Sequence, residues 1–230
     1  MVLQPVSGRA GPAVGCADVP GKAAAWWPGV RLRIKRSVAA RMRGQVEVNR
    51  LVAQGLELGR GVYVAPTAYL DPGQPWLIQI ADESVIGPWA IVLAHDASTR
   101  LHTGHTLVGR VTIGKRVYVG HGAIIMPGSS IGDDAVIEPG AVVRGDVPAR
   151  SVAAGNPAKV VSDTDSFAAR HREAIARDPV WPLRGWTLGS GITEERKAAQ
   201  RAALAGRCGY LASPRSALFS ARARRPRVSP

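Results

Sequence analysis

Aliphatic residues return at every sixth position over a long central stretch of the chain, and this period constrains the fold more than any other feature. Written in sixes, residues 111–146 read VTIGKR, VYVGHG, AIIMPG, SSIGDD, AVIEPG and AVVRGD. The third position of each six is aliphatic, the first is small or β-branched, and glycine, aspartate and proline fill the later positions. Helices repeat every 3.6 residues and flat strands every 2, so neither explains the pattern.

A short strand followed by a turn does explain it. One aliphatic side chain per strand would point inward, and these residues are Ile113, Val119, Ile125, Ile131, Ile137 and Val143. Three such sixes close a triangular coil of about 18 residues, and stacked coils bury columns of similar side chains. We therefore predict an all-β fold, namely a left-handed parallel β-helix of hexapeptide repeats with flanking N- and C-terminal α-helices.

The same period predicts the domain boundaries. It breaks at DPGQP (71–75), and it fails again between Val92 and Ile113. We expect the β-helix over 55–161, with about 93–109 expelled from a corner as a loop, and a long loop in a compact repeat is usually functional. Outside it we expect a disordered segment at 1–30, a basic helical cap at 31–54, a helical extension at 162–212 and a disordered basic tail at 213–230.

The net charge of +13 belongs to two arms. Residues 31–50 hold seven Lys or Arg and one acid, residues 201–230 hold seven Arg and no acid, and the remaining charges cancel. A nucleic-acid-binding domain usually carries a basic face, so we expect no nucleic-acid partner. Residues 31–43 also carry an apolar stripe, which indicates either a solvated cap over the first coil or a weak contact with an anionic membrane surface.

Cysteine usage and hydropathy bear on the compartment. Cys16 and Cys208 do not form a CxxC pair, which fits a reducing environment. No apolar run approaches the roughly 18 residues that span a bilayer, and we identify no signal peptide. We therefore expect a cytoplasmic protein whose membrane contact, through 31–43, is peripheral and at the inner face.

Three stretches resemble the hexapeptide-repeat acetyltransferases that O-acetylate sugars and polysaccharides. They are IGPWAIVLAHDAST (86–99), the repeats from VTIGKR to NPAKVV (111–161) and the stretch from WTLGSGITEERKAAQ to GY (186–210), and the likeness runs from about 51 to 211. The resemblance implies acetyl-CoA as the acyl donor, no metal, and a sugar or saccharide as the acceptor. It also implies a homotrimer whose active site lies between neighbouring subunits.

Acetyl transfer from a thioester to a hydroxyl needs a base and donors for the oxyanion, and an imidazole suits the base. His95 lies where the coil gives way to the loop, and the resemblance places the family's catalytic histidine at this corner. Asp96 would orient its ring, contact the sugar or cap a turn. Trp89, His102 and His105 are the other candidates for contact with the acceptor, although solvated loop histidines are also common.

The resemblance also implies a slot for the coenzyme. Lys159 would meet its phosphates as a point charge. His121 departs from the small residue usual in relatives, and Arg144-Gly145 stands where many relatives have Thr-Lys. The residues that would line the pantetheine slot are Gly120, His121, Pro139, Arg144 and Gly145.

Three alternatives stay open from the sequence. N-acetylation of an amino sugar would use the same scaffold and donor. A zinc-dependent carbonic anhydrase type would use the histidines between His95 and His121, but Met126 stands where that family's signature has a second histidine. A non-enzymatic binding scaffold would need no histidine at the loop corner.

Overall fold

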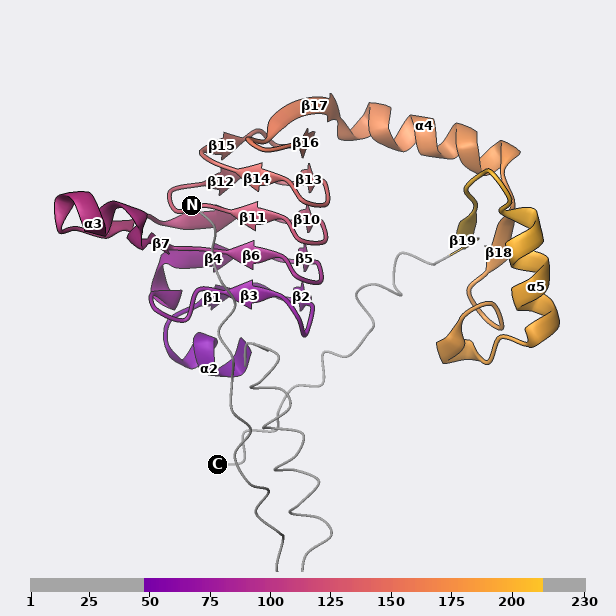
Figure 1. Ribbon diagram of the computed structural model, residues 1–230, viewed down its shortest axis with the longest axis horizontal. Coiled ribbons are helices and arrows are strands. Elements are labelled where there is room, and N and C mark those ends of the chain that lie inside the picture. The colour runs from indigo at the N-terminus through magenta and orange to yellow at the C-terminus, as the bar shows by residue number, and fades with distance from the viewer. Residues whose placement is uncertain (1–47, 213–230) are drawn as a thin grey trace, which may run out of the picture. The chain divides into compact units, whose positions relative to one another are not determined.

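The computed structural model describes residues 48–212 of the 230-residue chain, and its largest part is a stack of triangular coils (Figure 1). Three sheets with parallel strands form the walls, so the predicted left-handed parallel β-helix is confirmed. Successive regular coils pair residues 18 positions apart, as Thr112 with Ser130 and Tyr118 with Val136. One coil therefore contains three sixes, as the period predicts.

We name the walls A, B and C. Wall A contains β1 (Glu57–Leu58), β4 (Ile78–Ile80), β9 (Val111–Ile113), β12 (Ser130–Ile131) and β15 (Asp146–Val147). Wall B contains β2 (Tyr63–Val64), β5 (Val85–Ile86), β10 (Tyr118–Val119), β13 (Val136–Ile137) and β16 (Ser151–Ala154), with β17 (Lys159–Asp163) antiparallel to β16. Wall C contains β3 (Tyr69–Leu70), β6 (Ile91–Val92), β11 (Ile124–Ile125) and β14 (Val142–Val143).

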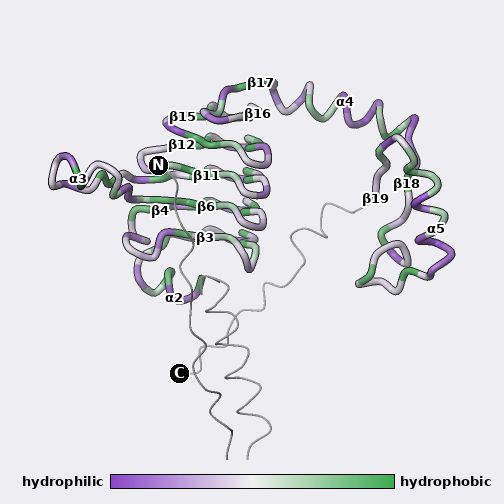
Figure 2. Tube along the Cα trace, viewed as in Figure 1, coloured by the Kyte–Doolittle hydropathy of each residue, from purple (hydrophilic) through white to green (hydrophobic). Residues whose placement is uncertain are grey.

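The inside of the prism is a column of aliphatic side chains on each wall. Ile113, Val119 and Ile125 lie on walls A, B and C of one coil, and each is at most 1% exposed. Figure 2 shows the apolar residues following the stacked strands. Small residues at the first position of the six, such as Ala123 and Ala135, are fully buried at the bends. The period of six is thus a packing pattern, because each coil must repeat the inward residue of the coil below it.

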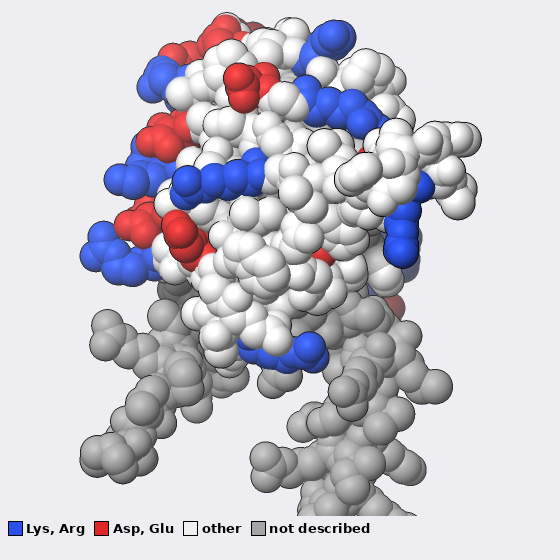
Figure 3. Space-filling view, turned by 90° about the vertical axis from the view of Figure 1, so that its left-hand side faces the viewer, with Lys and Arg blue, Asp and Glu red and all other residues white. Residues whose placement is uncertain are grey.

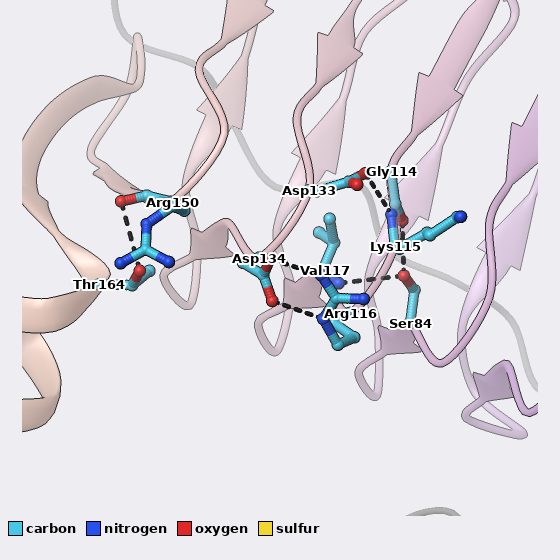
Figure 4. Close-up of polar contacts among 9 residues, drawn as sticks. All are labelled: Ser84, Gly114, Lys115, Arg116, Val117, Asp133, Asp134, Arg150 and Thr164. Carbon is cyan, nitrogen blue, oxygen red and sulfur yellow. Dashed lines mark hydrogen bonds and ion pairs between the residues drawn. The ribbon is translucent and has the colours of Figure 1, made fainter.

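Charged residues of opposite sign alternate along the edge between walls A and B (Figures 3 and 4). Arg60 pairs with Asp82, Arg116 with Asp134 and Arg150 with Asp165, and the amide of Lys115 donates to Asp133. Arg116 holds the pKa of Asp134 below its usual range through a side-chain hydrogen bond. These exposed pairs each contribute little to stability, roughly 0–1 kcal/mol. The edge between walls A and B therefore carries pairs of opposite charge and none of the residues predicted for the site.

Two insertions interrupt the coils, and both leave the prism at the edge between walls C and A. The first, which we call the strap, is residues 71–77; it follows β3 and includes the 3-10 helix η1 (Pro75–Leu77). The second, which we call the arm, is residues 93–110 between β6 and β9. It contains an antiparallel pair, β7 (His95–Asp96) and β8 (Leu107–Val108), with η2 (Ala97–Thr99) and α3 (Arg100–Thr103) at its tip.

After the last coil the chain forms two longer helices and a small parallel pair. Helix α4 (Thr164–Arg177) is capped by Asp163, and α5 (Glu194–Ala203) is capped by Thr193, so both helices lie within the predicted helical extension. Strands β18 (Val180–Pro182) and β19 (Tyr210–Ala212) pair, and η3 (Leu188–Ser190) lies between β18 and α5. The rings of Trp181 and Trp186 lie 5.6 Å apart in this part of the chain.

Several predictions concern residues outside the described range. The disordered segment at 1–30, most of the basic cap at 31–54, the membrane contact through 31–43, Cys16 and the tail at 213–230 lie there; only α2 (Val48–Ala53) represents the cap. Within 48–212, no helix is long and apolar enough to cross a membrane.

Candidate functional site

A buried carboxylate holds the ring of His95 at the edge where the strap and the arm leave the prism. His95 Nδ1 lies 2.5 Å from Asp71 Oδ2. Asp71 is fully buried, whereas the His95 side chain is 37% exposed. An ionised carboxylate only accepts hydrogen bonds, so beside ionised Asp71 a neutral ring would carry its proton on Nδ1 and keep the lone pair of Nε2.

Backbone amides fix this carboxylate from both sides. Asp71 Oδ2 also accepts from the amides of Ala94 at 2.9 Å and His95 at 3.0 Å, and Oδ1 accepts from the amide of Gly73 at 2.9 Å. These donors compensate for the loss of water around a buried charge. With three amide donors, Asp71 is a rigid support for the ring.

Burial first, and the Asp71 charge second, raise the pKa of the Tyr69 phenol on the outer side of wall C.

Strand register explains why these residues meet. Leu70 in β3 pairs with Val92 in β6. Asp71 and Gly73 therefore occupy the places directly beneath Leu93 and His95, one coil lower, although the chain between them is irregular. Ideal placement of a Cβ on Gly73 would bring it within 3.3 Å of His95 Cε1 and 3.2 Å of Asp71 Oδ1.

Asp96 does not orient the ring, which corrects one of the roles expected for it. Its side chain accepts from the amide of Ser98 at 2.9 Å and caps η2. The pKa of Asp96 is lowered, first by the Ser98 amide and further by the charges of Arg144 and His95. The capping role expected as an alternative is the one that the contacts show, and Asp96 remains close to the ring.

The other arm histidines lie farther along the arm. His102 is exposed in α3, and His105 is held by a contact of 2.6 Å between its Nδ1 and the carbonyl oxygen of Thr103. Thr99 Oγ1 donates to the carbonyl of His105 at 2.7 Å, so the tip is braced by its own hydrogen bonds. Neither ring makes a hydrogen bond to the Asp71–His95 pair.

The predicted acceptor and coenzyme residues are divided between two edges. Trp89, His121 and Pro139 lie at successive coils of the edge between walls B and C, on the other side of wall C from His95. Trp89 is 62% exposed and has a φ of 61°, which is the turn conformation that Gly122 (φ 66°) and Gly140 (φ 72°) adopt at the same place in the next two coils. Gly120 is buried beside Pro139, where a Cβ would lie 2.6 Å from the Pro139 nitrogen.

Of the remaining candidates, two lie at the edge of His95 and Lys159 lies on wall B. Arg144 and Gly145 follow β14 at the edge between walls C and A, which is the edge of the strap and arm. Lys159 is exposed at the start of β17. Within the described residues, no group of three or more His, Cys, Asp or Glu side chains is arranged to hold a metal ion. Cys208 is free and exposed.

Comparison with known proteins gives one family match. Residues 102–145 match the family described as bacterial transferase hexapeptide (six repeats). The matched range contains regular coils and seven of the predicted site residues, but it excludes Asp71 and His95.

Acetyltransferases are found among both the relatives and the solved structures. A chloramphenicol acetyltransferase from Agrobacterium fabrum is 44% identical over 68 residues, which are 28% of this chain and 32% of that protein. The chain spans between 32% and 56% of the length of this and three other curated relatives that it matches.

Two solved structures illustrate the structural matches. A maltose O-acetyltransferase from Clostridium difficile 630 is 24% identical with a TM-score of 0.40, over 58% of this chain and 87% of that one. The hexapeptide-repeat acetyltransferase VCA0836 from Vibrio cholerae is 22% identical with a TM-score of 0.42, over 61% and 94%.

Sequence reasoning missed Asp71 and Gly73. The signal was present, because DPGQP breaks the period directly after the inward-facing Leu70, as the arm does after Val92. Two breaks at the same place in consecutive coils predict two insertions at one edge. Polar residues near the start of each insertion then lie close together.

The cap on η2 generates a pH-dependent prediction. The pKa of Asp96 is lower in the folded chain than in the unfolded chain, so its stabilising contribution is complete above about pH 3.9 and is lost as pH falls through the lower folded value. Carboxyl ¹³C NMR should give Asp96 a midpoint below about 3.9. Ser98→Pro removes the backbone and the side-chain donor of Ser98, so it should raise the Asp96 midpoint more than Arg144→Gln does. A wild-type midpoint at or above the unfolded value would contradict the cap.

Proposed function

We propose that this chain transfers an acetyl group from acetyl-CoA to a hydroxyl of a sugar or polysaccharide precursor, with His95 as the general base. The observation that carries the proposal is the Asp71–His95 pair, which leaves Nε2 of a partly exposed imidazole free at an edge of the prism. A base presented in one fixed tautomer is what proton removal from a hydroxyl requires.

The reaction divides into two steps. Nε2 takes the hydroxyl proton as the acceptor oxygen attacks the thioester carbonyl, which forms a tetrahedral oxyanion. The oxyanion then collapses, the carbon–sulfur bond breaks, and the coenzyme thiolate leaves with the proton returned by the imidazolium. Asp71 stabilises that imidazolium without itself taking the proton. Backbone amides at the edge are the expected oxyanion donors.

The regular coils would bind the coenzyme. Parallel walls offer backbone groups to the pantetheine amides, Lys159 would meet the phosphates, and Arg144 lies at the same edge as the base. Trp89, Asp96, His102 and His105 are proposed contacts for the acceptor. The match of residues 102–145 to a hexapeptide transferase family and the acetyltransferase names of the relatives support this assignment.

The division of the site between two edges supports a trimer. Gly120, His121 and Pro139 lie at the edge between walls B and C, so in one chain they cannot face the same ligand as His95. A second copy could place its edge beside the base of the first. The outward residue of each strand fits this arrangement, because walls B and C expose Tyr63, Tyr118, Tyr69, Ile91, Ile124 and Val142, while wall A exposes Glu57, Gln79, Thr112, Ser130 and Asp146.

Replacing the base tests the mechanism. His95→Ala should lower kcat by about 10²-fold or more, the usual scale of general-base loss, with little change in coenzyme binding. The assay is release of the coenzyme thiol from acetyl-CoA over a panel of mono- and oligosaccharides. His171→Ala is the control, because His171 contacts Tyr210 near the end of the described chain and has no proposed role.

The same assay separates the alternatives. Turnover of His95→Ala at the wild-type rate would remove His95 from the mechanism. Product only with amino sugars would replace O-acetylation by N-acetylation, and no turnover with any acceptor would favour a binding scaffold. The cytoplasmic location and the membrane contact through 31–43 stay predictions.

The trimer generates a separate prediction. Ile124→Glu places a charge on the outer side of wall C, and it should convert the trimer to smaller species and abolish turnover. Thr112→Glu places the same charge at the matching position of wall A and should leave the trimer intact. Sedimentation velocity measures both. A wild-type chain that is monomeric and active would contradict the shared site.

A further inference from the structure

Gly73 lies against the Nδ1–Cε1 edge of the His95 ring. It occupies the place one coil beneath His95, because β3 and β6 pair Leu70 with Val92. A Cβ at Gly73 would lie 3.3 Å from His95 Cε1, 3.5 Å from His95 Nδ1 and 3.2 Å from Asp71 Oδ1. Its nearest neighbours are therefore the two members of the candidate catalytic pair.

We propose that Gly73 is a positioning residue for His95: its bare backbone closes the Nδ1–Cε1 edge of the ring and keeps the ring on Asp71, so that only the Nε2 side is open to the acceptor. The inference rests on the proposed function for its kinetic consequence. Its structural part stands on the described contacts alone.

The contacts also indicate which group would yield to a larger residue. Gly73 cannot retreat easily, because its amide donates to Asp71 Oδ1 at 2.9 Å. Asp71 cannot retreat either, because it is fully buried and its Oδ2 accepts from the amides of Ala94 and His95. The His95 ring is the partly exposed member of the group, so a methyl at position 73 would displace the ring.

Gly73→Ala is the test, with Gly189→Ala as the matched control because a Cβ at Gly189 has open space around it. We expect Gly73→Ala to fold, to keep the wild-type KM for acetyl-CoA, and to lose kcat by about 10-fold or more, since small misplacements of a catalytic group are costly. Gly189→Ala should change neither constant.

NMR signals of the His95 ring test the positioning role without an assay of acetyl transfer. In protein labelled with ¹⁵N-histidine, the His95 signals, assigned by their absence from His95→Gln, should show a protonated Nδ1 and a bare Nε2 at a pH where the ring is neutral. Gly73→Ala should shift them towards a mixture of both tautomers. This result would stand even if no acetyl transfer were found, so the two proposals fail separately.

A double-mutant cycle separates positioning from general damage. If Gly73 acts through the Asp71–His95 pair, Gly73→Ala should lower kcat by less than about 2-fold in an Asp71→Asn background, because coupled residues are not additive. Wild-type ring signals in Gly73→Ala would overturn the proposal, as would full additivity. Failure of Gly73→Ala to fold would also overturn the proposal, because the added methyl would then have disturbed the coil and not only the His95 ring.

Discussion

Each short strand of the prism contributes one aliphatic side chain to the interior, and the columns that these side chains form fix the register of every coil. Ile113, Ile125 and their neighbours cannot slip by one residue without turning the column outward. Insertions are therefore tolerated only at the edges, between strands. The strap and the arm obey this constraint, and the constraint brings them to the same edge in consecutive coils.

The candidate site follows from that register. Asp71 begins the strap, His95 lies at the base of the arm, and the pairing of Leu70 with Val92 sets one insertion beneath the other. The carboxylate is buried at no great cost because backbone amides of both insertions donate to it. A flexible loop could carry a histidine, but it could not keep one edge of the ring in contact with a buried carboxylate. The regular coils therefore fix the positions of the two insertions, and the insertions carry the side chains of the candidate site.

The amino-acid sequence predicts the regular part of this molecule well and the irregular part poorly. The inward residues could be read from the period, because burial acts on every sixth residue in the same way. The corner that carries His95 could be found because the period stops there. The break at DPGQP marks the edge on which Asp71 lies, but its contact with His95 is seen only in the folded register, because the strap lengthens its coil so that Leu70 and Val92 pair 22 positions apart instead of 18.

The two aspartates near the ring offer the most direct test of the account, because both are close to His95 and only Asp71 bonds to it. We predict that Asp71→Asn lowers kcat for acetyl transfer by about 10²-fold or more at an unchanged affinity for the coenzyme, since the ring loses its fixed tautomer. Asp96→Asn alters a proposed acceptor contact without touching the Nδ1 bond, so it should raise the KM for the acceptor and keep kcat within a few fold of wild type. Equal rates for wild type and Asp71→Asn, measured under saturating acetyl-CoA, would contradict the claim that this buried carboxylate makes His95 a base.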